Sequence, residues 1–160
     1  MAAKFVPEGF HRITPFMMVE ELDKLVEFLK QAFEAQEVFR TDDGGHPFAE
    51  VRIGDSMIMI SEGWKSMTGE WKPGQCAIYL YVEDADATYK RAIEAGGISV
   101  MGLADQDYGD RRCGIQDPAG NYWWIATHMR DVTPEEHAKE ESADKTTGYY
   151  DRFVLQAAAS

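Results

Sequence analysis

The sequence predicts an α+β fold in which one βαβββ unit occurs twice in tandem. Val19-Glu20-Glu21-Leu22-Asp23 follows a short apolar strand and opens an amphipathic segment, and Val82-Glu83-Asp84-Ala85-Asp86 repeats this arrangement 63 residues later. Strand-like runs broken by glycine-rich turns follow each segment. A repeat near half of the chain length indicates two similar α/β units and not a solenoid. We expect the strands to form an open, cup-shaped mixed sheet with the helices outside, which leaves room for a small molecule.

The first half is predicted over about residues 10–62. A strand at 13–19 leads into a helix at about 21–34, because apolar residues recur there at helical spacing. These residues are Leu22, Leu25, Val26, Leu29 and Phe33. Three more strands follow, at 37–41, 48–53 and 56–61. They are separated by two segments with the composition of turns, Asp42-Asp43-Gly44-Gly45 and Gly54-Asp55.

The second half repeats the pattern over about residues 75–130. A strand at 77–82 precedes a helix that ends at Gly96-Gly97, a pair typical of helix C-termini. The apolar side of this helix carries Ala85, Tyr89, Ala92 and Ile93. Three strands follow, at 99–103, 111–116 and 122–127. The turn Asp117-Pro118-Ala119-Gly120-Asn121 precedes the last strand, so residues 1–130 are predicted to be one domain made of two halves.

Residues 131–160 are predicted to form a C-terminal helix and tail. Thr133-Pro134-Glu135-Glu136 combines a capping threonine, a proline at the first helical position and a reciprocating glutamate. Residues 149–155 are apolar enough to dock on another surface, such as a second subunit.

The composition excludes several classes of partner. A chain of 160 residues with 44% hydrophobic content can bury a core. A net charge of -12 disfavours nucleic acid and anionic membranes, whose phosphates would be repelled. No apolar run reaches the roughly 18 residues of a membrane span, and residues 1–10 contain no apolar signal-peptide core. Cys76 and Cys113 lie in different segments and suggest free thiols, so we expect a cytoplasmic protein.

Strand alternation predicts which side chains face the cup, since successive residues of a strand lie on opposite faces of its sheet. In the strand at 48–53, Ala49, Val51 and Ile53 are apolar and should face a helix. The same reasoning in both halves gives the candidate ligand-binding residues, which are Thr14, Phe16, Phe48, Glu50, Arg52, Met59, Tyr79, Tyr81, Arg112 and Trp124. Aromatic and methionine side chains with a few polar groups are typical of a small-molecule pocket. The same pattern also fits a filled core.

Glu50 is the best candidate for a catalytic residue. A carboxylate among aromatic rings is desolvated, which raises its pKa and suits a general base. A simple ion pair with Arg52 or Arg112 is the alternative interpretation. Cys113 lies beside two arginines and could be an activated thiol. Its helix-facing position favours a buried structural thiol instead.

These motifs resemble the vicinal oxygen chelate superfamily, which includes glyoxalase I, extradiol dioxygenases, and fosfomycin- and bleomycin-resistance proteins. The resemblance rests on the paired βαβββ units, the segment at 82–86 and the turn at 117–121, and it covers about residues 6–138. Three further segments resemble the PhnB-like branch: Val6-Pro7-Glu8-Gly9, Tyr108-Gly109-Asp110-Arg111, and the region from Ala126-Thr127-His128 to Glu136. The resemblance implies a glyoxalase/bleomycin-resistance fold and a homodimer. It also points to Arg111 as a cup residue, whereas alternation points to Arg112.

One departure from the family affects the expected chemistry. The resemblance places the four metal-ligand positions of glyoxalase-type enzymes on Thr14, Met59, Ala77 and Trp124. None of these side chains is a competent ligand for a divalent cation of this kind. The PhnB-like pattern often has a histidine where this chain has Phe48, and among the four histidines only His128 is predicted to see the cup. We therefore expect neither a metal nor another cofactor.

Three functions remain open at this point. The leading hypothesis is a bleomycin-resistance-like module that binds a small organic ligand in an aromatic cup without the usual metal. The second is a glyoxalase-like lyase or isomerase with Glu50 as general base, so that the sequence leaves open whether the protein is an enzyme. The third is a domain with a filled cup that acts through its tail at 149–155.

Overall fold

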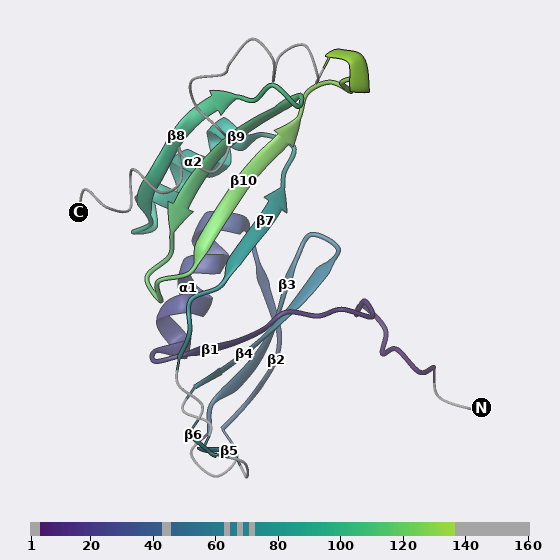
Figure 1. Ribbon diagram of the computed structural model, residues 1–160. Coiled ribbons are helices and arrows are strands. Elements are labelled where there is room, and N and C mark those ends of the chain that lie inside the picture. The colour runs from purple at the N-terminus through teal and green to yellow at the C-terminus, as the bar shows by residue number, and fades with distance from the viewer. Residues whose placement is uncertain (1–3, 43–45, 63–64, 67–68, 71–72, 137–160) are drawn as a thin grey trace.

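The computed structural model describes residues 4–42, 46–62, 65–66, 69–70 and 73–136. Within them the predicted βαβββ order occurs twice, as Figure 1 shows. His137, most of the turn at 42–45 and the segment at 149–155 lie outside the described residues. The predictions made for them therefore stay predictions.

The first half forms a four-stranded mixed sheet with one helix. Its elements are β1 (Phe16–Val19), α1 (Leu22–Phe33), β2 (Gln36–Thr41), β3 (Phe48–Ile53) and β4 (Ser56–Glu62). The strand order is β1-β4-β3-β2, with β1 parallel to β4 and the other pairs antiparallel. The parallel pair is possible because α1 forms the crossover between the two strands.

The second half repeats this topology. Its elements are β7 (Ala77–Tyr81), α2 (Ala85–Glu94), β8 (Ile98–Asp105), β9 (Asp110–Gln116) and β10 (Tyr122–His128). The order β7-β10-β9-β8 matches that of the first sheet. The short strands β5 (Lys65–Ser66) and β6 (Gly69–Glu70) pair with each other between the halves. Phe16 pairs with Met59 as Tyr79 pairs with Trp124, which confirms the offset of 63 between the first strands.

The first strand is shorter than the sequence predicts. It begins at Phe16 and not at residue 13, because Pro15 has no N–H to donate to a neighbouring strand. The Pro15 carbonyl still accepts a hydrogen bond from the Met59 N–H at 2.9 Å. Thr14 therefore lies before the strand, where its hydroxyl donates to the His11 carbonyl at 3.2 Å. The alternation that placed Thr14 in the cup does not extend to it.

One hydrophobic core joins the two halves. Helix α1 buries Leu25 and Leu29 against the first sheet, while the Phe33 ring at its end lies 4.8 Å from the Trp123 ring of β10. Helices α1 and α2 also pack against each other (Figure 1). Ile93, predicted on the buried side of α2, is instead 37% exposed. The two sheets are thus held in a fixed relation by their helices.

The first N–H group of each helix donates a hydrogen bond to a side chain of the last strand in the same half. The Leu22 N–H of α1 donates to the Glu62 carboxylate at 2.9 Å, and the Ala85 N–H of α2 donates to the Thr127 hydroxyl at 2.8 Å. Such side chains satisfy N–H groups that have no partner within the helix. Helix α2 ends at Glu94 with Ala95 as its C-cap, and the predicted glycine pair follows directly, with Gly96 at a φ of 103° that favours glycine.

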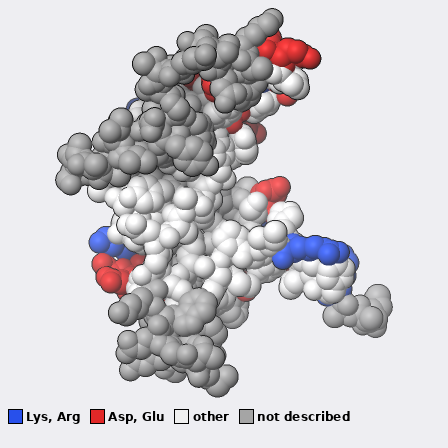
Figure 2. Space-filling view, viewed as in Figure 1, with Lys and Arg blue, Asp and Glu red and all other residues white. Residues whose placement is uncertain are grey.

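None of the helices in the described ranges is long and apolar enough to cross a membrane. Figure 2 shows a largely uncharged surface across the middle of the molecule. The largest group of basic atoms on this side lies on the extended segment that leads into β1, and a smaller group lies at the left edge beside acidic atoms.

Candidate functional site

Each sheet has one face covered by a helix and one opposite face that carries aromatic side chains. On the first sheet the aromatic residues of this opposite face are Phe16, Phe39 and Phe48, and we call this surface, together with Glu50, Arg52 and Met59, the phenylalanine face. The register places Phe39, Glu50, Met59 and Phe16 in one row across the strands. The rings of Phe16 and Phe39 each lie 6.3 Å from the ring of Phe48.

The equivalent surface of the second sheet is the tyrosine face, made of Tyr79, Tyr81, Arg112 and Trp124. The Tyr79 and Tyr81 rings lie 5.0 Å apart, and their side chains remain 39% and 62% exposed. Rings with this exposure do not form a filled core within the described residues, and they offer a surface on which a ligand can stack.

The buried guanidinium of Arg112 contacts three aromatic rings at the tyrosine face. Its guanidinium carbon lies 5.0 Å from the ring centre of Trp124, 5.7 Å from that of Tyr108 and 6.0 Å from that of Tyr79. The residue is only 3% exposed, so cation–π attraction to three rings acts in a site shielded from water. Arg111 points to the opposite side, where it binds Asp86 and Asp105. The structure thus places Arg112 on the face that alternation assigned to it.

Trp124 can lie across β9 because its neighbour there is Gly114. A Cβ atom at Gly114 would overlap the six-membered ring of Trp124 and would come within 3.0 Å of Val100. The absence of a side chain at this position therefore fixes how closely the tryptophan approaches the sheet.

A buried carboxylate at the start of β9 connects the polar groups of the tyrosine face. Asp110 is 2% exposed and accepts hydrogen bonds from the Tyr79 hydroxyl at 2.9 Å and, at its other oxygen, from His128 Nδ1 at 2.8 Å. His128 Nε2 lies 3.0 Å from the Asp131 carboxylate. The chain Asp131–His128–Asp110–Tyr79 holds one ring of the tyrosine face in place.

These contacts shift the titration of each group. Burial favours a higher pKa at Asp110, but hydrogen bonds from His128, Tyr79 and Tyr81 outweigh it and lower the pKa. The pKa of His128 is raised by its hydrogen bonds to Asp110 and Asp131. Burial and hydrogen bonds to Tyr108 and Asp110 raise the pKa of Tyr79. Tyr79 therefore remains a neutral hydrogen-bond donor and Asp110 a charged acceptor at neutral pH.

Asp110, Tyr108 and Gly114 were not among the predicted site residues, although Tyr108 and Asp110 belong to a segment that resembles the PhnB-like branch. Asp110 lies two residues before Arg112, so the alternation that places Arg112 on the tyrosine face also places Asp110 there. An acidic residue at an inward position beside an arginine was the signal available. Nothing in the sequence pattern singles out Gly114.

Glu50 does not form the ion pair that was its simpler interpretation. None of the described residues gives its carboxylate an ion pair or a hydrogen bond, although the residue is partly buried. Arg52 donates to the Gln36 amide oxygen instead, and Arg112 belongs to the second sheet.

Metal-ligand chemistry does not fit the residues that the resemblance indicated. Thr14 lies before β1, and Met59, Ala77 and Trp124 bring a thioether, a methyl group and an indole to the sheet faces. The described part of the chain contains no group of three or more His, Cys, Asp or Glu side chains placed to hold a metal ion. Burial raises the pKa of Cys113 to about 12, which opposes an activated thiol.

The Asp117 turn serves the fold and not the site. One carboxylate oxygen of Asp117 accepts hydrogen bonds from the N–H groups of Ala119 and Asn121, both at 2.9 Å. The other accepts from the Trp123 indole at 2.8 Å. Asn121 in turn accepts a hydrogen bond from the Cys76 N–H at 3.2 Å.

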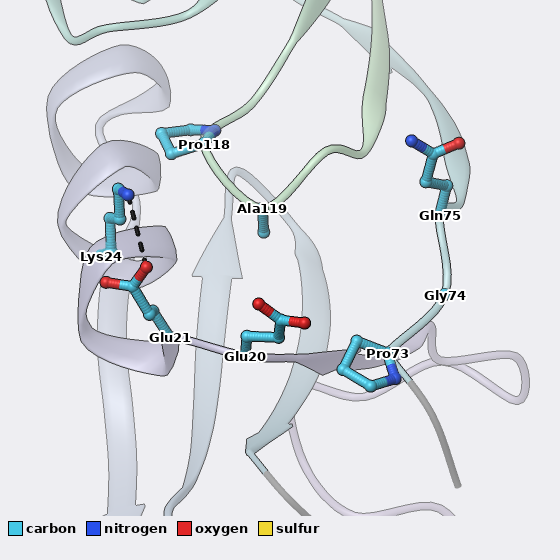
Figure 3. Close-up of a pocket in the computed structure, with 8 residues that line it drawn as sticks. All are labelled: Glu20, Glu21, Lys24, Pro73, Gly74, Gln75, Pro118 and Ala119. Atoms are coloured by element: carbon cyan, nitrogen blue, oxygen red, sulfur yellow. Dashed lines mark hydrogen bonds and ion pairs between the residues drawn. The ribbon is translucent and has the colours of Figure 1, made fainter.

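A cavity of about 250 Å³ lies away from both aromatic faces (Figure 3). It is bounded by the entry to α1, the segment before β7 and the turn before β10. Its lining residues are Glu20, Glu21, Lys24, Pro73, Gly74, Gln75, Pro118 and Ala119. Glu21 and Lys24 form an ion pair at 3.4 Å across one side of it. None of the predicted site residues lines this cavity.

Comparison with known proteins places this fold in a family. Residues 9–125 match the model of the Glyoxalase/Bleomycin resistance protein/Dioxygenase superfamily. An uncharacterised protein of Mycobacterium bovis is 33% identical over 133 residues, which cover 78% of this chain and 88% of that protein.

Two solved structures are similar in fold. TioX from Micromonospora sp. ML1 has a TM-score of 0.59 at 21% identity, over 73% of this chain and 99% of that one. The fosfomycin resistance protein FosX from Mesorhizobium loti has a TM-score of 0.52 at 19% identity, over 81% and 97%.

Proposed function

Because the chain belongs to the glyoxalase/bleomycin resistance protein/dioxygenase superfamily, we propose that it binds a small organic ligand against its aromatic sheet faces without the usual metal. The main support for this proposal is the structure of the tyrosine face. Tyr79 and Tyr81 stay accessible, while Arg112, Gly114 and Asp110 fix the residues around them. Such a preorganised aromatic surface suits binding, since few side chains must be ordered when the ligand arrives.

The proposed working form is a homodimer of a cytoplasmic, PhnB-like protein. The homodimer is supported by the large apolar side chains left exposed on both faces, among them Phe16 at 39% and Phe39 at 50%. Exposed apolar surface of this kind marks binding or subunit contact. A second copy that faces these surfaces would shelter a bound ligand from water.

Nuclear magnetic resonance of the protein treated with a chelator tests the binding function. Small aromatic compounds should cause saturable shifts in the amide signals of β7, β9 and β10 and of β3 and β4. Shifts that appear only after a divalent metal is added, or that map to the cavity of Figure 3 instead, would contradict the proposal.

A second candidate function is a glyoxalase-like lyase or isomerase. It is favoured by Glu50, whose carboxylate lies on the phenylalanine face without an ion pair among the described residues. As a general base it would remove the proton from the hydroxyl-bearing carbon of an α-hydroxyketone to form an enediol, as the carbonyl oxygen gains a proton. The protonated Glu50, which exchanges its proton with solvent, would then protonate the former carbonyl carbon while the other oxygen loses its proton. Deuterium uptake from D₂O by a small α-hydroxyketone measures this step. Catalysed uptake that Glu50→Gln abolishes would favour the enzyme over the binding module.

A further inference from the structure

We propose that the ligand of the phenylalanine face carries a positively charged nitrogen, which Glu50 binds. This inference rests on the proposed binding function and deepens it, because it names the chemical class of the ligand: an organic amine, a quaternary ammonium or an amidinium with an apolar body.

The strand register places Glu50 beside the aromatic ring of Phe39 and the thioether of Met59. On β3 it lies two residues after Phe48, on the same face of the sheet. It pairs across the strands with Met59 on one side and with Phe39 on the other. Because Phe48 also contacts Phe16, the carboxylate lies at the edge of a cluster of three aromatic side chains. The faces of aromatic rings carry partial negative charge and attract cations.

The charges around this cluster favour a cation over other ligands. Arg52, the basic residue nearest in sequence on this face, keeps its charge, but its guanidinium is directed to the Gln36 amide oxygen on β2 and forms no ion pair with Glu50 among the described residues. Arg112 is 3% exposed beneath the rings of the second sheet, so its charge is shielded from a ligand there. An anion would be repelled by Glu50 and by the net charge of -12.

A neutral ligand fits less well than a cation. A hydroxyl of a neutral ligand can donate one hydrogen bond to the Glu50 carboxylate but does not balance its charge, and burying a charge without a counter-charge is costly. An ammonium group supplies that partner and also contacts the ring faces. The cost of desolvating Glu50 is thus offset most fully by a ligand of opposite charge.

Three probes that share a phenyl ring test the inference: benzyltrimethylammonium, benzyl alcohol and benzoate. Their dissociation constants are measured from amide shifts of β3 and β4. Wild-type protein should bind the cation about tenfold more tightly than benzyl alcohol, as expected for a cation–π contact near a carboxylate. Benzoate should bind more weakly than either.

Two variants assign this preference to the face. Glu50→Gln should abolish the preference for the cation while benzyl alcohol still binds. Phe48→Leu keeps the carboxylate and should reduce the preference severalfold. The control Glu83→Gln changes the net charge equally but lies in the turn between β7 and α2, so it should leave all three dissociation constants unchanged.

The outcomes separate this inference from the binding function itself. Equal binding of cation and alcohol, or a cation preference that survives in Glu50→Gln, would overturn the inference and leave the binding function standing. If none of the probes shifts any signal of either face, both the inference and the proposed binding function fail.

Discussion

Asp110 and His128 form a hydrogen-bonded pair of titratable groups at the tyrosine face. The carboxylate is buried, and His128 bridges it to Asp131 across the end of β10. A protonated imidazole donates to both carboxylates, whereas a neutral one can donate to only one of them. The contact should therefore weaken when His128 loses its proton.

We predict a pH-dependent contribution of His128 to stability. Its folded-state pKa is raised above the ordinary value of 6.5, so its stabilising effect is fully present below that value and is lost as pH rises through the folded-state pKa. The difference in melting temperature between wild type and His128→Gln should shrink from pH 5.5 to pH 9. Parallel curves would contradict this, and His11→Gln, at an exposed position, is the control.

The close approach of Gly114 to Trp124 makes this position sensitive to any added side chain. Gly114→Ala should destabilise the protein by about 1–3 kcal/mol, because the new methyl group overlaps the Trp124 ring and something must shift. Urea unfolding measures the loss, and near-ultraviolet circular dichroism should report a moved tryptophan. The control Gly102→Ala lies on β8 with no heavy atom within 4 Å of the new Cβ, and it should change stability by less than about 0.5 kcal/mol.

Alternation along the strands was sufficient to group several site residues, because one face of each sheet is covered by a helix. It placed Tyr79, Tyr81, Arg112 and Trp124 on one face, where the structure also has them. Their role in ligand binding stays a prediction. Alternation could not show that Arg112 lies beneath three rings, since that depends on side-chain length and on neighbours from two other strands and from the turn between β8 and β9.

At the scale of the elements, local signals predicted most of the fold. The turn residues and helical spacing fixed the order of all eight principal strands and both helices. Strand β1 was predicted too long because Pro15 and Thr14 fit the alternation but not the hydrogen bonding. The pair β5 and β6 was not predicted, since each strand has only two residues and carries no periodic pattern.

The turn before β10 depends on the carboxylate of Asp117. Asp117→Ala should cost about 2–4 kcal/mol, because it leaves buried N–H groups of Asn121 and Trp123 without an acceptor. Chemical denaturation measures the loss. Asp107→Ala removes an exposed carboxylate from the turn between β8 and β9 and should be nearly neutral. An equal effect of the two substitutions would contradict the structural role of Asp117.

The internal repeat predicts that the whole molecule consists of two similar halves. It does not predict how the two halves pack against each other. The contact between Phe33 of the first half and Trp123 of the second depends on how the end of α1 packs against β10. That arrangement follows from side-chain shapes over long sequence separations, which periodicity does not encode.

The shared core predicts that the two halves unfold together. Phe33→Ala should destabilise the protein by about 3–5 kcal/mol and keep a single transition, with the same midpoint by circular dichroism and by tryptophan fluorescence. The exposed Phe5 provides the control, and Phe5→Ala should have little effect. Two separate transitions in the wild type would show that the halves are independent.

Native mass spectrometry of the purified protein tests whether the aromatic faces bind a ligand without a metal, because it reports subunit number, bound metal and bound small molecule together. We predict a dimer without a divalent ion that still binds an aromatic amine such as benzyltrimethylammonium after treatment with a chelator. One divalent ion per chain, with ligand binding that disappears when the ion is removed, would contradict metal-independent binding at the aromatic faces.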